Sequence, residues 1–557
     1  MVKIAAFIIT SLLCLTASAM PDWSANAVVP TGGRANIYDW SAEDLLRYQT
    51  QGKLHAQVYP VTVTGILPPY APVKRLLEEK SQNPLRNWLQ SALATISGID
   101  SFKDILLYLG LHKYPKSTDT GVYSAPYPEN LSADELMGFG LIERGGAKGF
   151  TFSCAACHSA NLFGKTVLGM TNRFPRANEL FVNAKRAIPL LDPHLFQLYS
   201  GATDAERRLL EETKASLGAV DLKAPIVLGL DTSLAQVSLS LNRRNKDPYA
   251  TLNPYYELHP RKDVFLDSNP ADSKPAVWWN LKYKNRWLSD GSVLSGNPIF
   301  TNLIWNEIGR GADLRKLEQW LSQNERIVEE ITTAVFSSEA PHITDFYPAE
   351  KIDLGRAQAG EQIFNKTCAG CHGHYEKAWS LPYASLLRPA EKLKTVVVKY
   401  HASTPVVNVG TDPFRRLGMK SLEQLNDLAI SKKNGIVIKA QDGYVPPPLV
   451  GIWARWPYFH NNSIPNLCAL LTPADRRPLA YYSGEANNPQ TDYDFECGGY
   501  PTGTKTPQSW AQRDHLFDTR RRGMSNIGHD VGIFIRDGKE ILSSEDKKNL
   551  IQYLQTL

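Results

Sequence analysis

The chain carries the pentapeptide CAACH at residues 154–158 and the related pentapeptide CAGCH at residues 368–372. A Cys-X-X-Cys-His sequence is the attachment site of c-type haem. In such a site two thiols bond to the porphyrin and the adjacent histidine supplies an axial iron ligand, because all three lie on one turn of the chain. The sequence therefore predicts two covalently bound c-type haems. The predicted attachment residues are Cys154, Cys157, Cys368 and Cys371, and the predicted iron ligands are His158 and His372.

A pair of zinc or thiol-redox sites is the alternative interpretation of two Cys-X-X-Cys sequences. That interpretation leaves the histidine after each cysteine pair without a role. It also fits a cytosolic protein better than an exported one.

The N-terminal segment has the pattern of a secretory signal peptide. Lys3 supplies a positive charge, residues 4–15 are largely apolar, and Ala17-Ser18-Ala19 offers a cleavage site of small residues. The apolar run is too short to span a membrane, and no later stretch reaches about 18 apolar residues, so we expect no transmembrane segment. Cleavage after about Ala19 would leave 557 − 19 = 538 residues and remove Cys14. We expect a periplasmic or secreted bacterial protein; an uncleaved N-terminal anchor is the alternative.

Composition and cysteine content agree with a globular exported protein. Apolar residues make up 43% of the chain, enough for a large buried core. The formal net charge of +5 over 557 residues is too small to indicate nucleic-acid binding. Beyond the four haem cysteines, the mature chain keeps Cys468 and Cys497, and exported proteins usually pair such residues. We expect a disulfide between them; two buried free thiols are the alternative.

We expect a mainly α protein of two cytochrome c-type haem domains with long loops and few short strands. The two motif histidines are 372 − 158 = 214 residues apart, more than one such domain needs. Residues 20–345 are predicted to form an N-terminal domain with large insertions and the active-site haem. Residues 346–557 are predicted to form a C-terminal domain with the electron-transfer haem. Periodic apolar residues predict helices over residues 205–217, 314–336 and 354–364, and at the C-terminus after Ser543 or Ser544.

The second axial ligand of each iron separates electron carriers from catalysts, because a closed iron cannot bind oxygen. For the second haem the best candidate is His529, in a glycine-flanked loop shortly before the terminal helix. Met524 in the same loop and His460 are the alternatives. For His460 we favour a role beside the haem, such as a hydrogen bond to a propionate.

The first haem has no comparable partner in the sequence. Met170 follows the first motif at short range, but we expect this iron to be open or weakly ligated. The aromatic run at residues 278–287 is a candidate for the pocket of this haem. Trp279 and Trp287 in this run are candidate catalytic residues, as pocket walls or as an electron bridge between the haems; ordinary core packing is the alternative.

Three further blocks carry a resemblance to a known family. They are GIWARWPYFHNNSIPNLCALLTPADRRP (Gly451–Pro478), GMSNIGHDVG (Gly523–Gly532) and WWNLKYKNRW (Trp278–Trp287). With the two haem motifs and the predicted signal peptide, the chain resembles the di-haem cytochrome c peroxidase superfamily. Within it the chain looks most like the branch of the methylamine-utilisation MauG proteins and the rubber oxygenases (RoxA-like), especially the latter. It departs from the pattern at Asn462, where glycine is usual.

The resemblance implies specific roles for matching residues. In the rubber oxygenases the N-terminal haem binds dioxygen in an apolar pocket, and the C-terminal haem has two histidine ligands. By the matching motifs, His158 would hold the first iron, and His372 with His529 would hold the second.

Two classes of function fit these features. The first is a haem-dependent oxidoreductase that activates dioxygen or hydrogen peroxide, and the second is an electron-transfer protein with both irons closed. The length of the chain favours the enzyme. A peroxidase needs a distal base, and no residue stands out as one, so we favour an oxygenase acting on a small or polymeric apolar substrate such as polyisoprene. A redox donor protein is a further expected partner.

Overall fold

A computed structural model describes residues 20–58, 61–80, 87, 99–129, 131–132, 135–231 and 234–557. The predicted signal peptide, its cleavage site after Ala19 and Cys14 lie outside these residues. None of the helices in the described ranges is both long and apolar enough to cross a membrane.

The described chain is mainly helical, as predicted. In the first part of the sequence the helices are α1 (Ala42–Gln57), α2 (Tyr70–Glu78), α4 (Phe102–Tyr108), α5 (Cys154–Cys157), α6 (Ala177–Ala187), α7 (Pro193–Ser200) and α8 (Asp204–Leu217). In the middle they are α9 (Leu234–Asn242), α10 (Pro254–Leu258), α11 (Val264–Ser268), α12 (Pro298–Gly309), α13 (Leu314–Gln323) and α14 (Glu325–Phe336). The last part holds α15 (Leu354–Thr367), α16 (Ala369–His372), α17 (Pro389–Lys392), α18 (Phe414–Gly418), α19 (Ala429–Lys433), α20 (Leu467–Leu470) and α21 (Ser544–Gln555).

The strands are short and pair two by two in antiparallel ladders. The pairs are β1 (His112–Lys113) with β2 (Leu136–Met137), β3 (Phe139–Arg144) with β4 (Ala147–Phe152), β5 (Ser159–Leu162) with β6 (Lys165–Leu168), β7 (Val293–Ser295) with β10 (Val437–Ile438), β8 (His374–Lys377) with β9 (Thr395–Lys399), β11 (Ala480–Tyr482) with β12 (Leu516–Asp518), and β13 (Ile535–Arg536) with β14 (Lys539–Glu540). In β3–β4 the register runs from Phe139 opposite Phe152 to Arg144 opposite Ala147, and this hairpin leads directly into α5 and the first motif.

The helix ends follow capping rules that are visible in the sequence. The Ser543 hydroxyl accepts a hydrogen bond from the backbone N–H of Asp546, and the Asp546 carboxylate accepts one from the backbone N–H of Ser543, so α21 begins where predicted. One predicted helix, over residues 314–336, is in fact two. Asn324 lies between α13 and α14, and its side chain donates to the carbonyl of Trp320 at 2.7 Å. Asparagine competes in this way with the backbone ladder and interrupts a helix.

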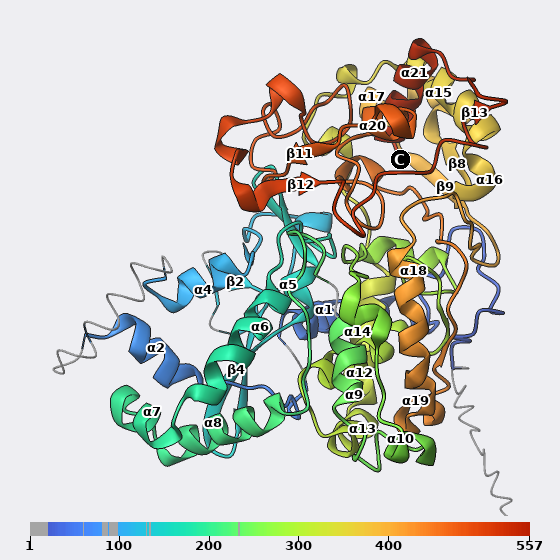
Figure 1. The fold of residues 1–557 in the computed structure, drawn as a ribbon. Helices are drawn as coiled ribbons and strands as arrows, with labels where there is room; N and C mark the ends of the chain where they lie inside the picture. The colour runs from blue at the N-terminus through green and yellow to red at the C-terminus, as the bar shows by residue number, and fades with distance from the viewer. Residues whose placement is uncertain are drawn as a thin grey trace, which may run out of the picture.

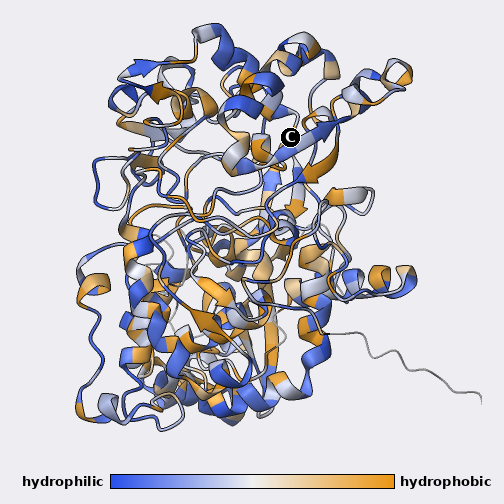
Figure 2. Cartoon of the chain, turned by 90° about the vertical axis from the view of Figure 1, so that its right-hand side faces the viewer, coloured by the Kyte–Doolittle hydropathy of each residue, from blue (hydrophilic) through white to orange (hydrophobic). Residues whose placement is uncertain are grey.

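Segments far apart in the sequence share the same cores (Figure 1). Helices α15 and α21 pack together at the C-terminal end of the molecule, and α1 packs on α14. Buried leucines of residues 419–428 belong to the same cluster as α9 and α12, and β10 pairs with β7. Helices in Figure 2 carry both hydrophobic and hydrophilic residues, as expected for amphipathic helices around buried cores. Residues on both sides of position 345 therefore build the central part of the molecule together.

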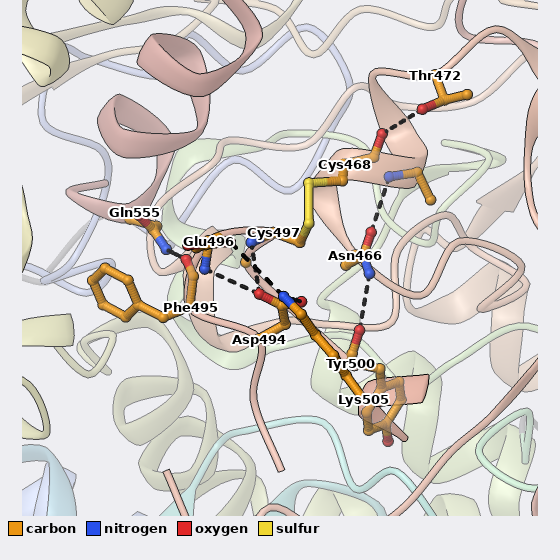
Figure 3. Close-up of a disulfide and its surroundings, with 12 residues drawn as sticks. Asn466, Cys468, Thr472, Asp494, Phe495, Glu496, Cys497, Tyr500, Lys505 and Gln555 are labelled. Atoms are coloured by element: carbon orange, nitrogen blue, oxygen red, sulfur yellow. Dashed lines mark hydrogen bonds and ion pairs between the residues drawn. A yellow bond between two sulfur atoms is a disulfide. The ribbon is translucent and has the colours of Figure 1, made fainter. Parts of the chain in front are cut away.

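The predicted disulfide between Cys468 and Cys497 is present (Figure 3). Cys468 lies in α20 and Cys497 in an irregular loop. Asp494 organises that loop, because its carboxylate accepts hydrogen bonds from the backbone N–H groups of Glu496 and Cys497. The disulfide thus joins the loop to a helix whose Leu467 and Leu470 line the central cavity described below.

Replacing Cys468 and Cys497 together with serine should lower the free energy of unfolding by about 3–4 kcal/mol, because the disulfide closes a loop of 29 residues' separation. Thermal and urea unfolding of the variant and of reduced wild-type protein would measure the loss. An unchanged midpoint in both would contradict a stabilising role.

Candidate functional site

Both Cys-X-X-Cys-His motifs line one cavity of about 480 Å³ that is partly open to solvent. The first motif forms the single turn α5, in which the backbone N–H of His158 donates to the carbonyl of Cys154 at 3.0 Å. In the second motif the N–H of His372 donates to the carbonyl of Cys368 at 3.0 Å, directly after α15. Each turn therefore presents two thiols and one imidazole from a compact stretch of backbone, the arrangement that one porphyrin requires.

The two motif histidines are held in the same way. Nδ1 of His158 donates to the carbonyl of Ala276 at 2.8 Å, and Nδ1 of His372 donates to the carbonyl of Pro447 at 2.8 Å. A carbonyl only accepts, so this bond fixes the proton on Nδ1 and leaves Nε2 unprotonated for a metal. Burial lowers the pKa of each imidazole to about 4, so both are neutral at pH 7.

The motif thiols lie in surroundings that disfavour thiolates. Burial raises the pKa of the Cys154 thiol to about 11 and that of Cys368 to about 12, and it also raises the pKa values of Cys157 and Cys371. Zinc and thiol-redox sites depend on a lowered thiol pKa. Within the described ranges, no three or more His, Cys, Asp or Glu side chains converge as a site for a bare metal ion. The residues present fit thioether-linked haem better than zinc or redox chemistry.

His529 faces His372 across the cavity. The centroids of the two imidazole rings are 6.2 Å apart. Two metal–nitrogen bonds of about 2.0 Å each, plus about 1.1 Å from each nitrogen to its ring centroid, add to about 6.2 Å. The spacing therefore suits one iron between the two rings. Burial lowers the pKa of His529 to about 3, which keeps this imidazole neutral.

The loop that carries His529 is fixed by residues of the block at 451–478. Arg477 donates to the carbonyls of Asn526 and Gly528, the latter at 2.8 Å. Asn461 donates to the carbonyls of Gly523 and Ser525. His529 itself has φ +60°, a left-handed conformation that is uncommon outside glycine, although asparagine, aspartate and histidine enter it more often than other residues do. These bonds outweigh the local backbone preference and hold the imidazole toward His372.

The departure at Asn462 has a conformational explanation. Its φ is +59°, in the left-handed region that favours glycine. Asparagine is the residue that enters this region most readily after glycine. The substitution therefore keeps the backbone path between His460 and Ser463.

The two alternative ligands for the second iron lie elsewhere. Met524 is 1% exposed and belongs to a hydrophobic core cluster, and it is absent from the cavity wall. His460 does line the cavity, but its ring stacks on Tyr444 with centroids 4.2 Å apart. The position of His460 agrees with a role beside a haem rather than on an iron.

The first motif lacks a facing ring of this kind. Met170, the candidate from the sequence, is 1% exposed and packed in the core. Among the described residues that line the cavity, the histidines are His158, His372, His460 and His529, and no methionine occurs. The ring nearest to His158 is that of Trp278, at 6.0 Å between centroids.

The two candidate tryptophans occupy different places. Trp287 packs on Trp23 and Phe336 and lines a smaller cavity of about 130 Å³ beside His158. Trp279 is fully buried and does not line either cavity. Its indole N–H donates to the carbonyl of Val450 at 2.9 Å.

Trp279 thereby connects the two backbone segments that hold the motif histidines. The first segment is residues 276–280. In it the carbonyl of Ala276 accepts the hydrogen bond from His158, and the side chains of Trp279 and Asn280 donate hydrogen bonds to the second segment. The second segment is residues 447–450, whose backbone carbonyls accept all three hydrogen bonds. The carbonyl of Pro447 accepts from His372, that of Pro448 from Asn280 and that of Val450 from Trp279. A short path of covalent and hydrogen bonds therefore runs between the two motif histidines.

Sequence reasoning missed one acidic group on the cavity wall. Asp231 lies near Cys157, and its carboxylate accepts hydrogen bonds from the backbone N–H of Asn178 at 3.1 and 3.2 Å. Burial raises its pKa to about 7. The residue gives no signal in the sequence, because it lies in a loop 231 − 157 = 74 residues beyond the motif.

Comparison with known proteins supports a cytochrome assignment. A family model described as RoxA-like, cytochrome c-like, matches residues 443–482. The chain is 23% identical to the uncharacterized protein y4iJ of Sinorhizobium fredii (strain NBRC 101917 / NGR234) over 474 residues, which are 73% of this chain and 76% of y4iJ. It is 28% identical to the uncharacterized protein y4iM of the same strain over 225 residues, 38% of this chain and half of y4iM.

The matched residues 443–482 contain the groups that support the site. They include Pro447, which accepts from His372, and Asn461 and Arg477, which hold the His529 loop. A cytochrome c-like domain implies haem c and suggests an oxidoreductase, and the match supports the RoxA-like branch.

Proposed function

We propose that this protein is an exported di-haem c-type cytochrome oxidoreductase that activates dioxygen at the haem of the first motif. The substrate class that we propose is an apolar alkene, with polyisoprene as an example, which undergoes oxidative cleavage. The observation that carries this proposal is the asymmetry of the two motifs. His372 faces His529, whereas no imidazole or thioether among the described cavity residues faces His158 in the same way.

The residues have distinct proposed roles. Cys154 and Cys157 attach the first haem and Cys368 and Cys371 the second, and haem iron supplies oxygen binding and one-electron transfer when it is bound. His158 and His372 are the proximal ligands, each oriented by a backbone carbonyl. His529 would be the second protein ligand at the iron beside His372, and that haem would then serve electron transfer.

Electron supply between the sites is the proposed role of Trp279. Its hydrogen bond to Val450 joins the segment behind His158 to the segment behind His372. Trp287, beside Trp278 near the first motif, is proposed as a wall of the first haem pocket. We further propose that residues 20–345 and 346–557 are two units with one motif each, which pack on each other through the shared cores, and that residues 1–19 are a cleaved signal peptide.

The wall around the first motif combines apolar and polar groups. Phe152, Phe181 and Leu234 supply apolar surface. Two of the polar side chains are engaged by the protein: Gln236 donates to the carbonyl of Gly309 at 2.6 Å, and Asn306 donates to Asn302 at 2.8 Å. The hydroxyl of Ser153 has no hydrogen-bond partner among the described residues. The apolar part of this wall supports an apolar substrate.

A peroxidase is the second candidate, and Asp231 is the observation that favours it. A buried carboxyl group whose pKa is raised to about 7 has the properties of a group that takes and returns a proton at neutral pH. Its oxygens already accept from the N–H of Asn178, which ties the carboxyl to the start of α6.

The binding of external ligands tests the asymmetry directly. We expect carbon monoxide or imidazole to perturb the spectrum of one haem only, because His529 blocks the other. Aerobic incubation with polyisoprene is expected to give carbonyl products without added peroxide. Product masses and the spectrum of the reduced protein would provide the measurement.

Other results would favour a different function. Activity that appears only with peroxide and a reduced donor, and falls in Asp231→Asn, would favour the peroxidase. If neither haem binds an external ligand in the oxidised or the reduced state, the protein would be an electron-transfer cytochrome rather than an oxygenase or peroxidase.

A further inference from the structure

The cavity between the two motifs contains three cations without carboxylate partners. They are Lys274, Lys284 and Arg455, and all three line the cavity. Lys284 also lines the smaller cavity beside His158. Arg455 lies close enough to His372 to lower its pKa, in addition to the larger effect of burial. Lys274 lies near His460. The three side chains therefore extend from the first motif to the second.

These cations have only backbone carbonyls as protein partners in the described part of the chain. Arg455 donates to the carbonyl of Pro448 at 2.9 Å. Lys274 donates to the carbonyls of Pro457 and Arg455, the latter at 3.3 Å. Within the described ranges, the ammonium of Lys284 has neither a hydrogen-bond partner nor an ion pair, and neither Lys274 nor Arg455 forms an ion pair.

Other cations of the same cavity are neutralised by the protein. Arg415 pairs with Asp290 at 3.1 Å, and Arg310 pairs with Glu307 at 3.4 Å. The contrast is informative, because a buried charge without a counter-charge is costly, and proteins pair such charges or neutralise them. Burial and the nearby Arg455 guanidinium lower the pKa of Lys284 to about 8, because both disfavour its charged form.

The missing negative charge is not supplied by the cavity wall. Among the described residues that line it, Asp231 is the acidic one, and its carboxylate is already bonded to backbone N–H groups at the start of α6. Burial lowers the pKa values of Lys274, Lys284 and Arg455, and an anionic ligand would stabilise their charged forms. Each haem carries two propionate groups on the edge opposite its vinyl groups, which supply such charge.

We propose that Lys274, Lys284 and Arg455 form one shared anion site that binds the propionates of both haems. In this arrangement the propionates of the two haems would approach the same cluster. Lys284 would bind a propionate of the first haem, Arg455 one of the second haem, and Lys274 one of each. This inference rests on the proposed function, because it requires a haem at each motif.

The shared cluster has a consequence for redox chemistry. A cation close to a haem stabilises the reduced form, which has one more negative charge, and the effect is large in a medium of low dielectric constant. One cluster serving both haems therefore raises both reduction potentials and couples them. Removal of one cation should lower the potential of the haem that it serves.

The test uses the full-length protein loaded with haem and three variants, Lys274→Gln, Lys284→Gln and Arg455→Gln. Haem content, the two reduction potentials and the propionate bending modes in resonance Raman spectra are measured for each. Lys282→Gln is the matched control, because Lys282 is a buried lysine two residues before Lys284 that donates to the carbonyl of Ser338 at 2.9 Å and does not line the cavity.

We expect Lys284→Gln to shift the first haem to lower potential and Arg455→Gln the second, with matching changes in the propionate modes. Lys274→Gln should affect both haems, and Lys282→Gln neither. Arg455→Lys keeps the charge but loses the paired donors, so it should move the modes and leave the potential near that of the wild type. This variant also provides a readout if Arg455→Gln does not fold.

Fully loaded variants with unchanged potentials and modes would overturn the propionate assignment and leave the proposed function intact. Shifts of equal size in Lys282→Gln would also overturn it, because they would show a general effect of buried charge. A wild-type protein without haem would overturn the inference together with the proposed function.

Discussion

Replacing Cys154 and Cys157 with alanine should remove one covalent haem and abolish oxidation of the substrate. The two thiols lie on the single turn α5 beside His158, whereas the other two free cysteines, Cys368 and Cys371, lie beside His372 in the second motif. Since the first haem carries the proposed chemistry, kcat/KM should fall by at least about 100-fold, equivalent to about 2.7 kcal/mol of transition-state stabilisation. Intact mass before and after acid-acetone extraction measures the covalent haem.

The matching variant at the second motif provides the control. Exchanging Cys368 and Cys371 for alanine should also remove one haem, but the remaining haem should still bind carbon monoxide. Wild-type protein that loses its haem in acid acetone would contradict covalent attachment. A chain with two haems after loss of Cys154 and Cys157 would contradict the assignment of the first motif.

Replacing His529 with alanine is expected to convert one low-spin haem to high-spin while haem content stays near two per chain. The imidazole is the group that faces His372, with 6.2 Å between ring centroids, and alanine leaves that position without a nitrogen ligand. Added imidazole should restore the low-spin spectrum by occupying the space. Electron paramagnetic resonance and visible absorption spectra report the spin states.

Two variants distinguish His529 from the alternatives. Met524→Leu should leave the spin states unchanged, because Met524 is packed in the core and away from the cavity. His460→Ala should also keep both spin states, because its ring stacks on Tyr444. An unchanged spin state in His529→Ala together with a change in either of these variants would remove His529 as the ligand.

The motifs and the helices next to them could be predicted because their signals are local. A Cys-X-X-Cys-His sequence places its three groups within one turn, whatever the rest of the chain does. The C-terminal helix begins directly after its N-cap residue Ser543, because Ser543 and Asp546, which cap it, are three positions apart. The split at Asn324 was missed, since the apolar periodicity continues through it and a single side-chain hydrogen bond breaks the helix.

His529 could be nominated from its glycine-flanked loop, but the sequence left Met524 and His460 as alternatives. The choice among three candidates depends on which of them the fold brings to His372. Arg477 and Asn461, which hold the loop, lie 529 − 477 = 52 and 529 − 461 = 68 residues before His529. No pattern along the chain indicates such contacts.

The amino-acid sequence was enough for the haem motifs, the mainly helical class and the expected disulfide, because each depends on residue types at short spacing or on composition. The common cavity, the meeting of His372 with His529, and the unpaired charges of Lys274, Lys284 and Arg455 depend on the tertiary structure. These features join segments more than 100 residues apart. Their formation depends on the burial of shared cores and on the cost of burying charge, and both are properties of the packed chain rather than of any segment.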